Sequence, residues 1–490
     1  IAAANAAAVT SVDGLIDIDG ENVSIGAAAA GIVEALGSGN VDIDANTTVT
    51  IGGNSALISS NTGNVSLVAT TTNVAIAGNS NLIGDDVTLT AAAGLVSIGD
   101  ALDNNRGGFD IDGLNIDNTG GALVAADTID LNATNTLNIT ADVTSGNDIN
   151  LTGAGTAISV GAVTLTAVED IDANQDVVVD GNATFTAERG NVTFDDDISS
   201  ETGAESLTVN AASGTVDFTD TIGADDTAVN GLTVTASAIE LGGNVTSDGN
   251  VSLTGAVSLD TAAVTITTSS DNLTIVGDVT GDQDFDINVT NAAVNIDGVD
   301  TNSLNLTNAG QTNLGGDIQA DDDVTLTAAT NVDLVANVEI LGDGSTAVLL
   351  DGGDVAGDFD LSIDSGTGAV TLDAIDINSL TVTSTGTTSI NDSITTDEGQ
   401  DYGDADDVDV AAGVTLTNAD SGTVDLGGGD VDAAGALDIA ASATNVVIGV
   451  LDVNAATEFD VNSTGTTTII GNITSAGGNV AFDGATNVVL

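Results

Sequence analysis

Several residue types are missing from this sequence, and each absence narrows what the protein can do. There is no cysteine, histidine, methionine, proline or tryptophan, and because the two basic residues are Arg106 and Arg189, lysine is absent as well. Without His and Cys, the nucleophile and base pairs of serine and cysteine hydrolases cannot form. Without Cys there is neither a disulfide framework nor a thiolate metal site. We therefore expect that the chain is not an enzyme.

Aromatic residues and long apolar runs are also scarce. Eight Phe and one Tyr account for the 2% aromatic content of the 490 residues, although hydrophobic residues reach 42%. A core of small aliphatic side chains suits a narrow interior better than a wide globular one. No run of about 18 apolar residues is available to span a bilayer, so we expect no membrane insertion by this segment. Because the chain starts at Ile1 and contains no Met, we expect a processed or excised segment.

Positive charge is almost absent. The chain carries 74 acidic and two basic residues, a formal net charge of -72. Such self-repulsion ordinarily favours disorder, but the apolar content argues for an ordered chain. We expect the carboxylates to have almost no partners within the chain, so cations from solution should neutralise them. A surface of this kind should bind neither nucleic acid nor an anionic membrane.

Short strings that alternate apolar and polar residues occur along the whole chain. Gly, Asn or Asp bounds each string, and these residues favour turns. Each string predicts a strand of about five residues with one apolar and one polar face. Clear examples are residues 64–68, 86–90, 162–166, 231–235 and 323–327. Helical spacing is nearly absent, and the one helix-like stretch, residues 27–36, is short enough to be a loop or a capping turn.

The predicted strands fall into a repeating frame. Phe194, Phe218 and Leu241 occupy equivalent places, and residues 139–151 match residues 241–253 without a gap. A repeat of about 24 residues with two or three short strands predicts an all-β fold, a parallel β-solenoid with one turn of chain per rung. We expect residues 1–490 to form one continuous solenoid segment of roughly 20 rungs. Candidate loop excursions are residues 27–37, 101–108, 341–357 and 396–412.

The rival fold is a string of β-sandwich domains, which also use short alternating strands. The absence of Pro and of any linker-like stretch argues against it. The scarcity of aromatic residues and the short period argue in the same direction. The pattern therefore favours the solenoid.

Two stretches resemble a known class of repeats. Residues 379–396 (SLTVTSTGTTSINDSITT) and 465–474 (GTTTIIGNIT) are similar to repeats of filamentous haemagglutinin-type and giant autotransporter-like bacterial surface proteins. The similarity in composition and period extends over nearly the whole chain. This resemblance implies a right-handed β-helix that is exported to the cell surface and is often adhesive or filament-forming. We accordingly expect an extracellular or cell-surface location.

Aspartates at alternate positions of the predicted strands suggest metal sites. Their carboxylates lie on one face about 7 Å apart, too far to share one ion. A carboxylate on the next rung, about 4.8 Å away, or a turn carbonyl would complete a hard-oxygen site for Ca²⁺. The alternative is that each Asp is a turn former or part of a solvated face. The candidate ligands are Asp17, Asp19, Asp110, Asp112, Asp282, Asp284 and Asp286 on strands, and Asp321, Asp322, Asp323, Asp404, Asp406 and Asp407 at corners.

These features favour a structural role as a stalk, fibre or surface filament. Open rung edges and the apolar stretch 487–490 predict end-to-end self-association. One alternative is an adhesin that recognises a receptor or glycan. A carbohydrate-active β-helix is less favoured, since no carboxylate pair stands out and aromatic sugar platforms are missing. Ice binding is a further alternative, suggested by Thr-x-Thr pairs at 88/90, 164/166, 184/186, 233/235 and 325/327.

Overall fold

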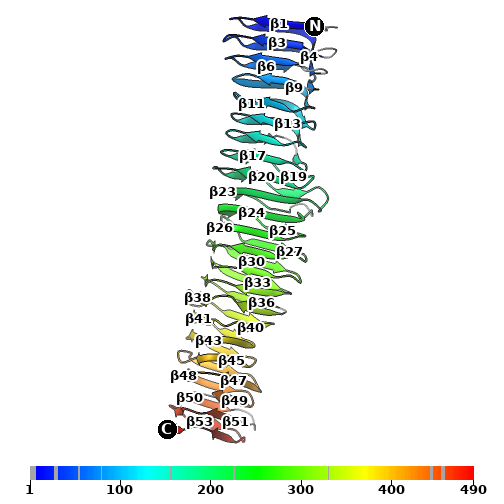
Figure 1. The fold of residues 1–490 in the computed structure, drawn as a ribbon. Helices are drawn as coiled ribbons and strands as arrows, with labels where there is room; N and C mark the ends of the chain where they lie inside the picture. Colours follow the sequence, from blue (N-terminus) through cyan, green and yellow to red (C-terminus); the bar gives the residue numbers. More distant parts are fainter. Residues whose placement is uncertain are drawn as a thin grey trace. The chain divides into compact units, whose positions relative to one another are not determined.

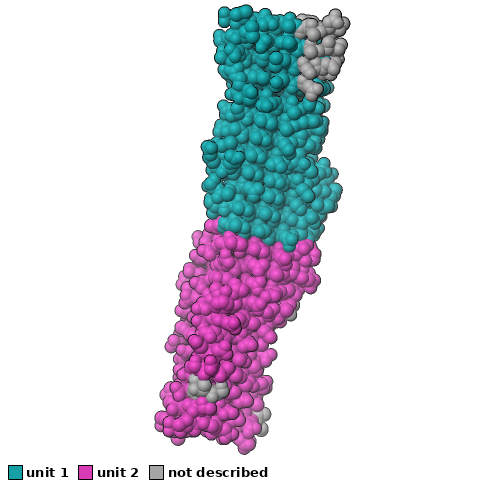
Figure 2. Space-filling view, viewed as in Figure 1, with its two compact units in different colours: residues 1–255 teal, residues 256–490 magenta. Residues whose placement is uncertain are grey.

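The chain is an all-β parallel solenoid in a computed structural model. The structure describes residues 7–26, 31–52, 56–78, 80–154, 157–223, 227–328, 330–441, 445–453 and 458–490. It divides into two compact units, Ile1–Gly255 (unit 1) and Ala256–Leu490 (unit 2), coloured separately in Figure 2. The described residues form about 22 turns, about 21 residues apart, and contain no helix. The predicted fold class is confirmed.

The repeat is shorter than the 24 residues that the sequence predicted, because the corners vary in length between strands of fixed register. A hydrogen bond between neighbouring rungs joins Thr48 to Asn22, 26 positions apart. In unit 2 the equivalent bond joins Asn313 to Asn295, 18 positions apart. The prediction of 24 came from a part of the chain with long corners.

The strands are short and follow one another along the whole chain (Figure 1). The first twenty-six are β1 (Ala7–Ser11), β2 (Ile16–Ile25), β3 (Gly31–Ala35), β4 (Val41–Gly52), β5 (Leu57–Ser60), β6 (Val65–Ala69), β7 (Val74–Ala77), β8 (Asn81–Ile83), β9 (Asp86–Ile98), β10 (Leu102–Asn104), β11 (Gly108–Asn118), β12 (Leu123–Ala125), β13 (Ile129–Ile139), β14 (Val143–Ser145), β15 (Ile149–Gly153), β16 (Ile158–Val160), β17 (Thr164–Ala167), β18 (Ile171–Ala173), β19 (Val177–Val179), β20 (Ala183–Ala187), β21 (Val192–Phe194), β22 (Ile198–Ser200), β23 (Ser206–Phe218), β24 (Gly231–Leu241), β25 (Val245–Ser247) and β26 (Val251–Leu259).

The remaining strands continue the same pattern. They are β27 (Val264–Thr268), β28 (Leu273–Val276), β29 (Val279–Thr280), β30 (Asp284–Val289), β31 (Val294–Ile296), β32 (Val299–Thr301), β33 (Ser303–Asn308), β34 (Gln311–Leu314), β35 (Ile318–Ala320), β36 (Val324–Ala328), β37 (Asn331–Leu334), β38 (Val338–Gly342), β39 (Val348–Asp351), β40 (Asp354–Ala356), β41 (Asp360–Gly366), β42 (Val370–Leu372), β43 (Ile375–Ser384), β44 (Thr387–Ile390), β45 (Ile394–Asp401), β46 (Asp407–Val410), β47 (Val414–Asn418), β48 (Thr423–Ala433), β49 (Leu437–Ala441), β50 (Asn445–Val453), β51 (Phe459–Ser463), β52 (Thr466–Ile469), β53 (Ile473–Ser475), β54 (Val480–Asp483) and β55 (Asn487–Val489).

Within each unit, strands of successive rungs pair in parallel and keep their side chains in columns. Phe194 of β21 faces Phe218 of β23, which faces Leu241 of β24. The equivalence of these three positions was predicted from the sequence and is confirmed. Because side chains alternate along a strand, a parallel register places the inward residues of one rung over the inward residues of the next. Most of these residues are apolar, but buried Thr312 lies between Val294 and Val332. The polar residues are aligned on the outside in the same way.

The core is a column of aliphatic side chains with one aromatic stack in unit 1. Phe185, Phe194 and Phe218 are each almost fully buried. The ring centroids of Phe185 and Phe194 are 5.1 Å apart in an edge-to-face arrangement, and those of Phe194 and Phe218 are 5.4 Å apart and parallel. Such contacts add to the burial of apolar area, which is the main source of stability for each rung.

Strands occur in each of the segments that the sequence marked as candidate excursions. Residues 27–30 lie outside the described residues, while Gly31–Ala35 forms β3, which pairs with β1 and β5. Residues 101–108 contain β10, and 341–357 contain β39 and β40. Residues 396–412 contain the end of β45 and all of β46.

Candidate functional site

The parallel register stacks outward carboxylates of neighbouring rungs at several places, among them Asp217 with Glu240, Asp401 with Asp425 and Asp438 with Asp460. Three further places include predicted ligands. The first is in unit 1, where Asp17 and Asp19 of β2 face Asp42 and Asp44 of β4. Burial raises the pKa of Asp42, and the negative charges of Asp44 and Asp17 add to that rise. Burial and the charges of Asp19 and Asp17 raise the pKa of Asp44 in the same way. Two predicted ligands, Asp17 and Asp19, therefore belong to a group of four carboxylates on two rungs.

The second place surrounds Asp110 of β11. Its neighbour on the next rung is Asp130, and both lie beside a groove of about 310 Å³ that Asp86 and Asp127 also line. Burial raises the pKa of Asp110, and the charges of Asp112, Asp130 and Asp86 raise it further. Asp112 differs, because its carboxylate accepts a hydrogen bond from Asn132 Nδ2 at 3.1 Å. Of the two predicted ligands, Asp110 thus faces a carboxylate on the next rung, Asp130, and Asp112 faces an amide, Asn132.

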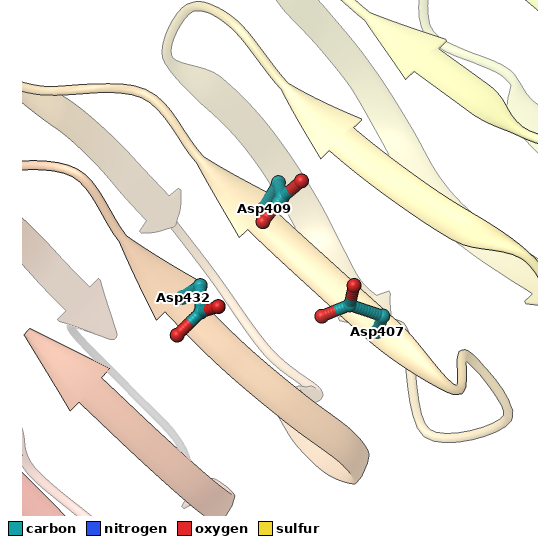
Figure 3. A group of neighbouring side chains, drawn as sticks. All are labelled: Asp407, Asp409 and Asp432. Atoms are coloured by element: carbon teal, nitrogen blue, oxygen red, sulfur yellow. The ribbon is translucent and has the colours of Figure 1, made fainter.

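The third place is in unit 2 and brings oxygens of three carboxylates together. One oxygen each of Asp407, Asp409 and Asp432 lies within 4.8 Å of the others. Figure 3 shows Asp407 and Asp409 on one strand and Asp432 on its neighbour. Asp409 and Asp432 are exposed, and Asp407 is half-buried. Three carboxylates at this separation can contribute one oxygen each to a divalent cation, with water completing its coordination. Asp407 and Asp409 are alternate residues of one strand, so the expectation that such carboxylates lie too far apart to share one ion is wrong at this place.

The column around these residues extends over three rungs. Asp407 faces Asp430, and Asp409 faces Asp432, which faces Asp452. Only Asp407 of this group was predicted from the sequence, and it was assigned to a corner. The repeated string Asp-Val-Asp at 407–409 and 430–432 was the signal that could have identified the others.

Two of the ligands predicted on strands, Asp284 and Asp286, face uncharged residues on the next rung. Asp284 faces Ser303 and Asp286 faces Asn305. The Asp284 carboxylate accepts hydrogen bonds from Asn302 Nδ2 at 2.6 Å and Ser303 Oγ at 2.8 Å, and these bonds lower its pKa. Asp282 is exposed just before β30. The structure does not bring Asp284 or Asp286 together with a carboxylate of the paired rung.

The predicted corner residues other than Asp407 lie in turns. Asp321, Asp322 and Asp323 are all exposed between β35 and β36, and Asp323 Oδ1 accepts the backbone N–H of Ala347 from the next rung at 3.1 Å. This bond links two neighbouring rungs and gives the Asp323 carboxylate a backbone partner.

Asp404 and Asp406 are exposed in the turn before β46. They precede the Asp407 group in the chain but are not among the three residues whose oxygens converge. The charge of Asp404 affects the pKa of Asp425. Burial raises that pKa, and the negative charges of Asp401 and Asp404 contribute to the rise.

Many carboxylates have neutral hydrogen-bond donors on the next rung, which the sequence did not predict. Asn150 Nδ2 donates to Asp130 at 2.6 Å, and Asn378 Nδ2 donates to Asp360 at 2.6 Å. Ion pairs within the described residues join Arg106 to Asp85 and Arg189 to Glu169. The expectation that the carboxylates have almost no partners in the chain is therefore wrong where an amide or hydroxyl occupies the facing position.

Comparisons with protein family models, with curated proteins and with solved structures give no match to this chain. Among the described residues, no helix is long and apolar enough to cross a membrane. The β-solenoid is consistent with a β-helix repeat protein.

Proposed function

We propose that the chain is an extracellular structural element, a β-solenoid stalk or fibre whose acidic columns bind cations, with Ca²⁺ as the divalent ion that fits them. The observation that carries the proposal is the convergence of Asp407, Asp409 and Asp432 within 4.8 Å. Carboxylate and water oxygens are the ligands that Ca²⁺ prefers.

Electrostatics supports the need for an ion. Two unit charges at about 4.8 Å, the rung spacing, repel by roughly 0.9 kcal/mol in water. In the column of Asp409, Asp432 and Asp452, the middle residue has a carboxylate on both sides. A divalent cation between these carboxylates attracts each of them and offsets their mutual repulsion. Because the unfolded chain does not hold the carboxylates together, ion binding stabilises the folded chain.

The proposed location follows from the affinity expected of such a site. The ligands are few and two of the three are exposed, which corresponds to the weak range of about 10⁻⁴ to 10⁻³ M found in extracellular calcium modules. Extracellular fluid supplies calcium in that range. The resemblance of the repeats to bacterial surface proteins supports the same location.

A filament is the proposed assembly. A solenoid rung has unpaired backbone N–H and C=O groups on any side where no further rung follows, and these groups can pair with another copy of the chain. Such contacts are head to tail and do not close, so they would generate a fibre. Electron microscopy of the purified chain with calcium should show particles longer than one molecule, and uniformly single particles at high concentration would contradict the filament.

The test of the ion is thermal unfolding followed by circular dichroism at low ionic strength. Millimolar CaCl₂ should raise the melting temperature above that measured with a chelator. The variant D409N/D432N should lose much of the calcium-dependent rise, whereas D321N/D322N, altered at an exposed corner, should keep it. Equal melting temperatures with calcium and with chelator in the unaltered chain would overturn the proposal.

A further inference from the structure

One face of unit 1 carries a regular array of threonines. It is formed by the outward side chains of β17, β20, the first half of β23 and the first half of β24, and we call it the threonine face. Thr164, Thr184, Thr208 and Thr233 face one another in one column of four successive rungs. The second column, two positions further along each strand, is made of Thr166, Thr186, Asn210 and Thr235.

The hydroxyl groups of this face are not used inside the protein. Within the described residues, the threonine Oγ1 atoms of the two columns have no hydrogen-bond partner in the chain. Threonines elsewhere commonly do: Thr71 Oγ1 donates to the carbonyl oxygen of Asn46 at 2.6 Å, and Thr140 Oγ1 donates to that of Asn118 at 3.2 Å. Thr164 and Thr233 are exposed, and the other threonines of the face are half-exposed. These hydroxyls are therefore available to water.

The face is also almost free of charge, although the chain has 74 acidic residues. The residues that flank the two columns in the outward direction are Ala162, Asn182, Ser206 and Gly231 on one side and Val168, Glu188, Ala212 and Ser237 on the other. Glu188 is the single charged residue in this set. On other strands of the same rungs, an outward column contains Asp172, Asp217 and Glu240. Acidic residues are thus frequent in that column, whereas Glu188 is the charged residue beside the columns of the threonine face. At one end of this face the Asp142 carboxylate of the preceding rung accepts the backbone N–H of Thr164 at 2.9 Å.

The packing behind the face holds its side chains in place. Phe185 lies between Thr184 and Thr186 along β20 and points inward, where it contacts the ring of Phe194 at 5.1 Å. Threonine is branched at Cβ, so its χ1 angle is restricted in a strand. The threonine methyl and hydroxyl groups consequently repeat at about 6.6–6.8 Å along each strand and about 4.7–4.9 Å between rungs.

We propose that the threonine face binds the surface of ice. A rigid array that repeats a hydroxyl and a methyl group at these two distances can hold a layer of water molecules in an ordered arrangement, since each hydroxyl both donates and accepts a hydrogen bond. The two repeat distances are close to the separations of water oxygens on faces of hexagonal ice. The near absence of carboxylates matters, because a charged group would orient its own hydration shell instead.

The test uses the whole chain in an ice-recrystallisation assay and in partition into a slowly growing ice front. The unaltered protein should inhibit recrystallisation and enter the ice. The variant T184K/T208K, which places two long charged side chains in the centre of one column, should lose both activities. The control T193K changes a threonine between Asp172 and Asp217 on the acidic column and should keep both.

Circular dichroism and melting curves establish that each variant is folded. The substitution T184V/T208V keeps the methyl groups and removes the hydroxyls, so a folded variant with weakened inhibition would support a role for hydrogen bonding to ice. Absence of inhibition by the unaltered chain would overturn the proposal, and so would full activity in T184K/T208K or an equal loss in T193K. Co-sedimentation of the unaltered chain with crystalline cellulose, without partition into ice, would assign the face to a flat polysaccharide and also overturn it.

Discussion

Replacing Asp432 by Asn removes one negative charge from the middle of the acidic column of unit 2. Asp432 faces Asp409 on one side and Asp452 on the other. Each repulsion at rung spacing is worth roughly 0.9 kcal/mol in water, so the upper limit of the relief is about 2 kcal/mol. Exposed charge pairs deliver only about 0.2–1 kcal/mol in practice. We therefore expect D432N to gain about 1 kcal/mol in its free energy of unfolding at low salt without divalent cations.

Urea denaturation followed by circular dichroism measures this change, since urea leaves the ionic strength unaltered. The screening length is about 30 Å at 0.01 M ionic strength and about 3 Å at 1 M, so the gain should shrink as NaCl is added. In millimolar CaCl₂ the sign should reverse, because the variant has lost one of the three carboxylates that converge.

The matched control is D321N, which removes an exposed carboxylate at a corner of the same unit. Its free energy of unfolding should neither increase in chelator nor decrease in calcium relative to the unaltered chain. The reasoning is refuted if D432N is destabilised in chelator at low salt, or if its difference from the unaltered chain is independent of both NaCl and CaCl₂.

The remaining predictions concern the core, a corner and pH. Phe194→Ala should cost about 3–5 kcal/mol, because Phe194 is buried between Phe185 and Phe218. Its outward neighbour in Thr193→Ala should cost less, because that variant loses only the hydrogen bond of the Thr193 side chain to Asp172. Gly422→Ala should lower the melting temperature sharply, since Gly422 has a φ of 101° and an added Cβ would lie 1.3 Å from the carbonyl oxygen of Glu398; an unchanged melt would contradict the corner geometry. Burial raises the pKa of Asp42, Asp110 and Asp172, so the folded chain binds these protons more tightly than the unfolded chain, and stability should rise as pH falls from 7 toward about 4. Hydrogen bonds lower the pKa of Asp284, and they lower that of Glu205 to about 2. These two groups therefore reduce stability as they become protonated at low pH, which opposes the rise given by Asp42, Asp110 and Asp172. Melting temperatures that fall steadily from pH 7 to 5 would refute the expected rise in stability.

The sequence predicted the strands and their equivalence well, because both are local properties. Alternation of apolar and polar residues identifies a strand without knowledge of its neighbours, as in residues 86–90 at the start of β9 and in residues 323–327, of which all but the first lie in β36. The equivalence of Phe194, Phe218 and Leu241 followed from equal spacing where the corners are alike. The same reasoning gave a repeat that is too long elsewhere, since paired residues are 20 positions apart between β11 and β13 (Phe109 and Ile129) and 19 positions apart between β30 and β33 (Phe285 and Leu304).

The candidate ion site was predicted only in part, because it depends on register across corners of unequal length. Asp407 was selected with Asp404 and Asp406 from its corner, yet its oxygen converges with those of Asp409 and Asp432. Asp432 lies on the next rung, and the number of corner residues between the two strands decides which carboxylate it faces. Pairing the repeated string at 407–409 with that at 430–432 would have supplied the missing register.

The net charge alone says little about where ions are needed, because the facing residue on the next rung decides the local repulsion. In one column of unit 1, Asp130 has Asp110 on one side and Asn150 on the other, and Asn150 donates a hydrogen bond to it. A neutral amide in that position replaces a repulsion by a charge-assisted hydrogen bond. We therefore expect cations to stabilise the fold chiefly where carboxylates face carboxylates on adjacent rungs, as they do between β2 and β4 and along β46, β48 and β50.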